Sequence, residues 1–262
     1  MAVILPEKST PFNKIQDFTF LIYGARKIGK TTIFSEFEDP FFFMFEPGGK
    51  ALSIKQAFMK DWATFLETIS LLEKRKGYCK TVIIDTGYMA YERCFEYSLR
   101  KLGIISPQDK SFGQAWKFID KEFRDAHMRL FELGVSIGVT AHSEVKEIKN
   151  RDGTTFNRLD TQLSAQAYRY YCGTMDVIGY YQKLDSGERV LQIQSDPFAE
   201  AGTRIENHFM YGNTNRPMET IPMGKNKKEA YANLLKAFNN EFSDPEKPVA
   251  SAKVASAKVA RK

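Results

Sequence analysis

Residues 24–31 read Gly-Ala-Arg-Lys-Ile-Gly-Lys-Thr and follow the apolar run Phe-Thr-Phe-Leu-Ile-Tyr at positions 18–23. Glycine, four free positions, glycine, lysine and threonine form the pattern of a phosphate-binding loop between a strand and a helix. The glycines allow the backbone to curl so that successive N–H groups point at an anion. A helix that begins near Lys30 adds the positive end of its dipole. We therefore expect a nucleoside triphosphate here; the alternative is a glycine-containing surface turn.

The residues expected to contact the nucleotide form one uninterrupted segment. Lys30 is expected to reach the β- and γ-phosphates, and the Thr31 hydroxyl is expected to ligate Mg²⁺. The full predicted set is Gly24, Ala25, Arg26, Lys27, Ile28, Gly29, Lys30, Thr31 and Thr32.

A second magnesium ligand is predicted at the end of another apolar run. Residues 81–85 read Thr-Val-Ile-Ile-Asp, a strand that delivers Asp85 to its carboxyl end. At the carboxyl edge of a parallel sheet this carboxylate would lie beside the phosphate loop and hold Mg²⁺. The alternative is a turn aspartate at the end of a strand.

A catalytic base is predicted after the run at 41–45, where Phe-Phe-Phe-Met-Phe is followed by Glu46 and Pro-Gly-Gly. The strand after the first helix of a parallel sheet lies near the phosphate loop. Glu46 is therefore expected to polarise a water for in-line attack on the γ-phosphate. The alternative is a glutamate that caps a helix or a turn.

The run at 135–141 ends in His142. A polar residue at this strand tip can touch the γ-phosphate and report its presence, so we expect His142 to act as a sensor. A histidine with a purely structural hydrogen bond is the alternative interpretation.

The order of the apolar runs predicts an α/β fold. Strands are expected at 18–23, 41–45, 81–84 and 135–141, with helices at 31–38, 62–75, 89–102 and 112–133. The last helix has apolar residues at Phe112, Ala115, Trp116, Ile119 and Phe123. Strands that alternate with helices indicate a mainly parallel, twisted sheet with helices on both faces.

The composition of the sequence changes after residue 142. Residues 143–165 are polar, with a turn at 150–153, and a β-hairpin is expected from 177–182 and 190–194. A third strand is expected at 203–210 and a final helix at 227–242. The chain divides into an irregular lead-in (1–16), one ATPase-like domain (17–243) and a basic, disordered tail (244–262) with a duplicated Ser-Ala-Lys-Val-Ala.

Composition limits the class of protein. The 262 residues carry a net charge of +6 and three widely spaced cysteines, which argues against a disulfide framework or a zinc site. No apolar run reaches the length of a membrane span, and the N-terminal apolar patch is too short for a signal peptide. We expect a cytoplasmic protein (in the host cytoplasm if a phage encodes it) with no membrane partner.

Together, the loop at 24–31, Glu46, Asp85 and His142 resemble the RecA-like ATPases, and more narrowly the phage RecA-like proteins of single-strand annealing recombination. The resemblance covers about residues 15 to 240. It implies a RecA-like P-loop core with a C-terminal β-hairpin extension, ATP with Mg²⁺, and a ring or filament with ATP between subunits. A cation from the neighbour is then expected at the γ-phosphate: Arg204 first, then Lys183 and Arg216.

The resemblance also implies that residues 143–170 line a path for single-stranded DNA, with a single-strand-binding protein as a further partner. Basic and aromatic residues alternate there, which suits phosphates and stacked bases. They are Lys146, Lys149, Arg151, Phe156, Arg158, Tyr168, Arg169 and Tyr170, with Tyr171 directly after the segment. The alternative is a solvated loop that leads into a helix.

Other functions remain open at this point. A GTPase is disfavoured because 85–87 read Asp-Thr-Gly, without the expected spacing, and a small-molecule kinase because no arginine-rich lid is evident. A DNA-packaging or helicase-loading ATPase would share nearly every residue above. A single-strand-binding module with negligible hydrolysis would differ in turnover alone.

Overall fold

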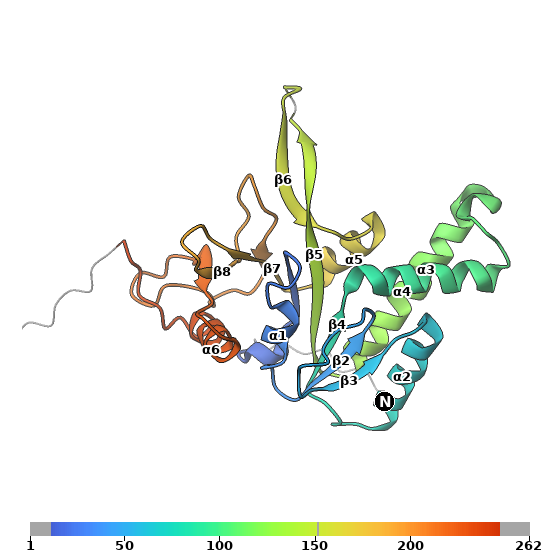
Figure 1. Cartoon of the computed structure of the whole chain (residues 1–262), viewed down its shortest axis with the longest axis horizontal. Helices are drawn as coiled ribbons and strands as arrows, with labels where there is room; N and C mark the ends of the chain where they lie inside the picture. The colour runs from blue at the N-terminus through green and yellow to red at the C-terminus, as the bar shows by residue number, and fades with distance from the viewer. Residues whose placement is uncertain (1–11, 151, 247–262) are drawn as a thin grey trace, which may run out of the picture.

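The computed structural model describes residues 12–150 and 152–246. One mixed sheet of ten strands forms its centre, in the order β10-β8-β7-β1-β5-β4-β2-β3 with β6 and β9 attached to β5 and β7 (Figure 1). The strands are β1 (Phe20–Gly24), β2 (Pro40–Met44), β3 (Lys55–Phe58), β4 (Thr81–Asp85), β5 (Ser136–Lys149), β6 (Thr155–Thr161), β7 (Val177–Lys183), β8 (Arg189–Gln192), β9 (Gly202–Thr203) and β10 (Thr220–Pro222). The run from β7 to β3 is parallel throughout. This confirms the predicted, mainly parallel α/β sheet.

Helices cover both faces of the sheet because its central strands are apolar on both sides. The helices are α1 (Lys30–Phe34), α2 (Trp62–Lys74), α3 (Gly87–Leu102), α4 (Gln114–Glu132), α5 (Ala165–Thr174) and α6 (Lys227–Phe238). In β1, Leu21 and Tyr23 face a core shared with α2 to α5, whereas Phe20 and Ile22 face a core shared with α1 and α6. The sheet is therefore a buried middle layer. Its two faces are covered by helices, so functional residues are expected at its edges and at the ends of its strands.

Several predicted helix boundaries were wrong. The first helix ends at Phe34 instead of continuing to residue 38, and the last ends at Phe238. The helix predicted from residue 112 begins at Gln114. Phe112 adopts φ 55° in the α3–α4 turn and is 92% exposed, so it does not belong to the apolar stripe of α4.

The C-terminal β-hairpin is confirmed as β7 and β8, which pair antiparallel and add β10 beyond them. The strand predicted at 203–210 is wrong, because β9 ends at Thr203 and left-handed residues follow at Asn207 (φ 62°) and Phe209 (φ 57°). Edge strand β3 was not predicted, since its sequence Lys-Gln-Ala-Phe is too polar and short to stand out.

The main unpredicted element is a long hairpin that projects from the sheet (Figure 1). Strand β5 continues past the sheet edge to Lys149 and pairs antiparallel with β6, from Ser143 opposite Thr161 to Lys149 opposite Thr155. We call residues 143–161 the arm. The sequence predicted an irregular polar segment here. Charged residues occur on both faces of the two strands, so the alternation of apolar and polar residues that marks a strand is hidden.

The predicted domain limits stay predictions, since residues 1–11 and 247–262 lie outside the described part. Asp244, the first residue assigned to the tail, is buried and accepts hydrogen bonds from Thr214 and Arg216. Among the described residues, none of the helices combines the length and apolar character needed to cross a bilayer.

Candidate nucleotide site

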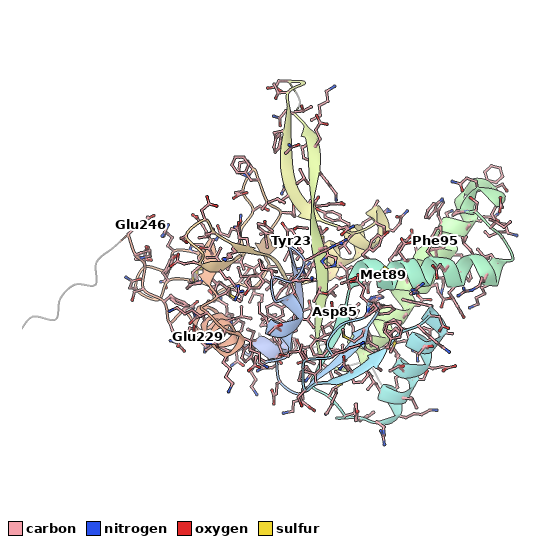
Figure 2. All side chains as sticks on the ribbon, in the orientation of Figure 1. Tyr23, Asp85, Met89, Phe95, Glu229 and Glu246 are labelled. Atoms are coloured by element: carbon pink, nitrogen blue, oxygen red, sulfur yellow. The ribbon has the colours of Figure 1, made fainter. Side chains whose placement is uncertain are left out.

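The parallel register brings the predicted site residues together at the carboxyl ends of the parallel strands. Gly24 lies beside His142, and Asp85 lies between Met44 and Thr140. Figure 2 labels Tyr23 and Asp85, whose strands β1 and β4 flank β5. A cavity of about 560 Å³ opens here, lined by Arg26, Lys27, Gly29, Lys30, Thr31, Thr32, Met44, Glu46, Pro47, Gly48, Asp85, Thr86 and His142.

Backbone geometry explains the two glycines of the loop. A Cβ atom at Gly24 would stand 2.1 Å from the Tyr181 carbonyl oxygen, so no larger residue fits between β1 and β7. Gly29 has φ 114° and precedes α1. Of the other predicted contacts, Ala25 contributes a carbonyl to the Lys30 amine, and Ile28 packs against the core under α1 and α6.

Lys30 is buried and its amine closes the loop. Nζ donates to the carbonyl oxygens of Gly24 and Ala25, both at 2.9 Å, and lies 3.4 Å from His142 Nδ1. Burial lowers the pKa of Lys30 to about 8, against the opposing effect of Asp85 and Glu46. The amine is thus mostly charged at neutral pH and held where phosphate oxygens can replace the loop carbonyls.

Thr31 and Asp85 lie in contact. Thr31 Oγ1 donates to Asp85 Oδ2 at 2.8 Å, while Thr140 Oγ1 donates to Oδ1 at 2.5 Å. A hydroxyl and a carboxylate side by side are the hard oxygen donors that Mg²⁺ prefers. These residues therefore fit the predicted metal, and Thr140 orients the carboxylate from behind.

Glu46 is engaged by two neighbours. Its Oε1 accepts from Thr86 Oγ1 at 2.8 Å, and its Oε2 lies 3.6 Å from His142 Nε2. The His142 ring, and then the Thr86 hydroxyl, hold the pKa of Glu46 below its usual range despite partial burial. Glu46 is consequently a carboxylate at neutral pH, the form that a general base requires.

His142 lies between the lysine and the glutamate. Its Nδ1 lies 3.4 Å from Lys30 Nζ, and its Nε2 lies 3.6 Å from Glu46 Oε2. Thr86 and Thr140 were not predicted; threonine near a strand end is too common to draw notice, although both sit at the ends that carry the motif residues.

Two of the three residues predicted to act from a neighbouring subunit have partners within the chain. Arg204 donates to the Gly173 carbonyl at 2.9 Å and lies 3.9 Å from Asp176, just before β7 begins, at the sheet end opposite the loop. Arg216 is bound to Asp244. Lys183 is the last residue of β7 and lies at the same end of the parallel strands as the phosphate loop.

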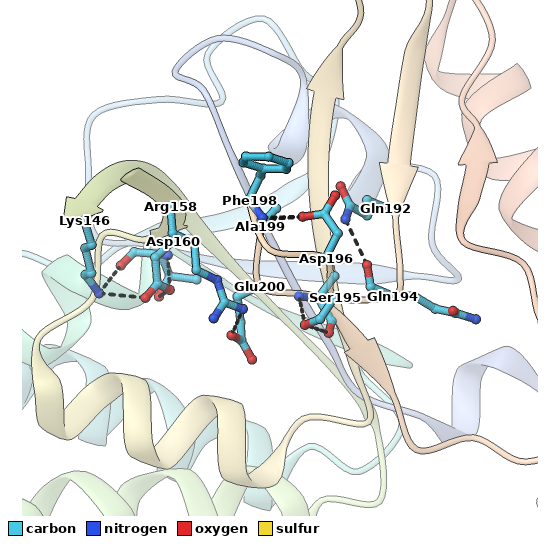
Figure 3. A network of polar contacts seen from close by, with 12 residues as sticks. Lys146, Arg158, Asp160, Gln192, Gln194, Ser195, Asp196, Phe198, Ala199 and Glu200 are labelled. Atoms are coloured by element: carbon cyan, nitrogen blue, oxygen red, sulfur yellow. Dashed lines mark hydrogen bonds and ion pairs between the residues drawn. The ribbon is translucent and has the colours of Figure 1, made fainter. Parts of the chain in front are cut away.

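Several residues predicted to contact DNA already have partners within the chain. Lys146 pairs with Asp160 at 3.1 Å, and Arg158 pairs with Glu200 (Figure 3). Tyr171 is fully buried, and its hydroxyl bonds the ring of His127, so it cannot stack on a base. These side chains stabilise the arm base and the core.

Comparison with known proteins identifies the family of the chain. Residues 16–205 match the AAA domain family. A KaiC-like protein from the archaeon Pyrococcus horikoshii OT3 aligns over 80% of this chain and 87% of its own, at 16% identity and a TM-score of 0.43. No curated protein matches the chain at a significant level. The chain therefore belongs to the AAA domain family of P-loop ATPases, which generally use ATP and Mg²⁺.

Proposed function

We propose that the chain hydrolyses ATP and uses turnover to act on single-stranded DNA through the arm, in phage-type recombination, annealing or replication. The observation that carries the proposal is strand β5. It places Thr140 and His142 at the nucleotide site and continues without a break to Lys149 on the arm. One strand thus connects the phosphate site to a projecting surface.

The site residues divide the binding of ATP among them. Lys30 exchanges its two loop carbonyls for β- and γ-phosphate oxygens, and the loop amides surround the anion. Thr31 and Asp85 hold Mg²⁺, which neutralises charge on the phosphates. Arg26 and Lys27 line the same cavity and add positive charge.

Glu46 acts as the base that takes a proton from the attacking water. Its Oε1 is oriented by Thr86, and its ionised form is favoured by His142. When the Lys30 amine moves to the γ-phosphate, its 3.4 Å contact with His142 changes. His142 is the last β5 residue before the arm, so the presence of the γ-phosphate reaches the arm through this ring.

The arm and its neighbourhood offer contacts that suit a single strand. Lys149 is exposed near the tip and Phe156 is half-buried on the opposite strand. Phe198, labelled in Figure 3, is 65% exposed. Its carbonyl accepts a hydrogen bond from the backbone N–H of Leu159 on the arm. An exposed cation binds phosphates and an exposed aromatic ring stacks on bases, in both cases without reading sequence.

Assembly into a ring or filament is part of the proposal and rests on resemblance to RecA-like proteins. A neighbour would then supply a cation to the open side of the cavity. Lys183, at the same sheet edge as the phosphate loop, is better placed for an interface at that edge than Arg204.

A second candidate function is an ATP-dependent single-strand-binding module with negligible hydrolysis, which could also serve a DNA motor or loader. Such a module would use the same phosphate and Mg²⁺ contacts, with Glu46 held by Thr86 and His142 as part of the binding site. Turnover measured beside ATP binding separates the two functions.

The proposal is tested by ATP turnover with and without single-stranded DNA across a salt series. DNA should stimulate turnover, and stimulation should fade as salt rises because phosphate contacts release counterions. Lys149→Gln should weaken stimulation about threefold, whereas the matched neighbour Glu147→Gln should preserve or increase it. Turnover that no nucleic acid stimulates would overturn the DNA part of the proposal.

A further inference from the structure

A second cavity, of about 420 Å³, lies between α3, α4 and α5, apart from the nucleotide site. Its walls include Tyr91 from α3, Phe123 and Asp120 from α4, and Tyr170 from α5. Arg124 and Arg169 also line it and are exposed. No step proposed above uses these residues.

Three buried polar atoms in this cavity have no partner. Within residues 12–150 and 152–246, Tyr91 Oη, Tyr170 Oη and Asp120 Oδ1 make no hydrogen bond. Tyr91 is 3% exposed. An unpaired buried polar group destabilises the fold, so three such groups on residues that line one cavity indicate a polar occupant that satisfies them.

The charges define what this occupant must carry. Burial raises the pKa of the Asp120 carboxyl, and the nearby Arg169 and Arg124 oppose the rise. One carboxylate with two guanidiniums leaves a net positive charge. The occupant therefore combines an N–H donor for Asp120 with an anionic group for the arginines.

Aromatic rings define its shape. Tyr91 and Tyr170 stand edge-on to Phe123, with ring centroids 5.2 and 5.6 Å away. Such walls favour a flat, unsaturated group with polar edges, and the cavity volume falls in the range of small-molecule sites. A nucleobase with its 5′-phosphate has the flat ring, the edge donor and the anion together.

We propose that this cavity binds one nucleotide unit, with the base edge on Asp120 and the tyrosine hydroxyls and the phosphate on Arg124 and Arg169. The inference deepens the proposed action on single-stranded DNA and rests on it for the source of the nucleotide. The cavity joins α3, which follows Asp85 and Thr86, to α5, which follows the arm. A bound nucleotide would thus bridge the elements attached to the metal site and to the arm.

The test titrates the four deoxynucleoside 5′-monophosphates into the full chain carrying Lys30→Ala, which silences the phosphate loop, with binding followed by calorimetry. The adenine, cytosine and guanine nucleotides should bind more tightly than dTMP. Their amino groups donate to a carboxylate, whereas thymine presents carbonyl oxygens beside its N–H. Asp120→Asn should weaken the preferred nucleotide about tenfold, and Asp125→Asn, the same change on the exposed face of α4, should leave it unchanged.

Arg169→Gln provides a second variant at an exposed position. It should weaken the monophosphate and leave the weaker binding of the matching nucleoside unaltered. Absence of binding at millimolar concentration, or equal binding of all four that ignores Asp120, would overturn the inference. Failure of DNA to stimulate turnover would instead contradict the proposed function and leave these titrations standing.

Discussion

The nucleotide site and the arm share strand β5, and they are built in opposite ways. At the site, the polar side chains are enclosed and bonded to one another, as in the contacts of Asp85 with Thr31 and Thr140. On the arm, side chains such as Val145 and Lys149 are exposed. The sheet fixes the first region through long-range register, while the second is held by a local antiparallel pair.

The enclosed half of β5 therefore contributes to stability, whereas its half on the arm is available for partner binding. A change in the enclosed half disturbs groups that depend on each other, so effects there should be large. A change on the arm meets solvent and should alter partner binding with little effect on folding. Substitutions in the two regions should therefore differ in the size and the kind of their effects.

Lys30→Ala removes the cation that closes the loop. Steady-state ATP turnover should fall by about 10³-fold or more, because the phosphates lose their main buried charge. Lys55→Ala, on exposed edge strand β3, should retain wild-type turnover. Full turnover in Lys30→Ala would remove the nucleotide site from this cavity.

Glu46→Gln keeps the shape of the side chain and removes the base. Turnover should fall by about 10²- to 10⁴-fold, with ATP affinity nearly unchanged. Glu38→Gln, an exposed glutamate before β2, serves as the control. Equal losses in binding and turnover would assign Glu46 a structural role.

Gly138→Ala tests the packing of the enclosed half of β5. An added Cβ would meet Phe34 at 2.5 Å and Ile83 at 2.6 Å, so the free energy of unfolding should fall by about 2–3 kcal/mol. Gly153→Ala, at the arm turn with φ 89° and nothing within 4 Å, should cost about 1 kcal/mol. Urea unfolding measures both, and a reversed order would contradict the contrast.

The Lys30 amine also predicts how ATP binding depends on pH. Its pKa of about 8 in the free protein means that the amine loses its proton as pH rises, whereas bound phosphates favour the charged form. ATP affinity should therefore drop about tenfold per pH unit above that pKa, with uptake of about one proton on binding. Calorimetry in buffers of different ionisation enthalpy measures this uptake, and Lys30→Arg should abolish it.

Much of the enclosed region could be predicted from the sequence, because its residues follow apolar strands at fixed places. Sheet register then brings Lys30, Glu46, Asp85 and His142 together. Their supporting hydroxyls, Thr86 and Thr140, could not be predicted, since no pattern marks which threonine faces a carboxylate.

The arm could not be predicted for the opposite reason. Its charges, such as Lys146 and Asp160, pair across strands and hide the alternation that marks a half-buried strand. Tyr171 was expected to face DNA because it follows basic residues, but it is buried in the core. The sequence could not show this, since aromatic side chains occur both on binding surfaces and in cores. Phe112 was expected on the apolar stripe of α4 because its spacing from Ala115 and Trp116 fits a helix, but Phe112 and Gly113 are left-handed and α4 begins only at Gln114.

Strand β5 is proposed to couple ATP turnover to the arm, and a variant with a shortened arm tests this coupling. Residues 147–157 can be replaced by Asn-Gly, which joins the facing residues Lys146 and Arg158 through a two-residue turn. ATP turnover of this variant and of the wild type is then measured with and without single-stranded DNA. The variant should keep its basal turnover and lose DNA stimulation; stimulation equal to that of the wild type would contradict the coupling through β5.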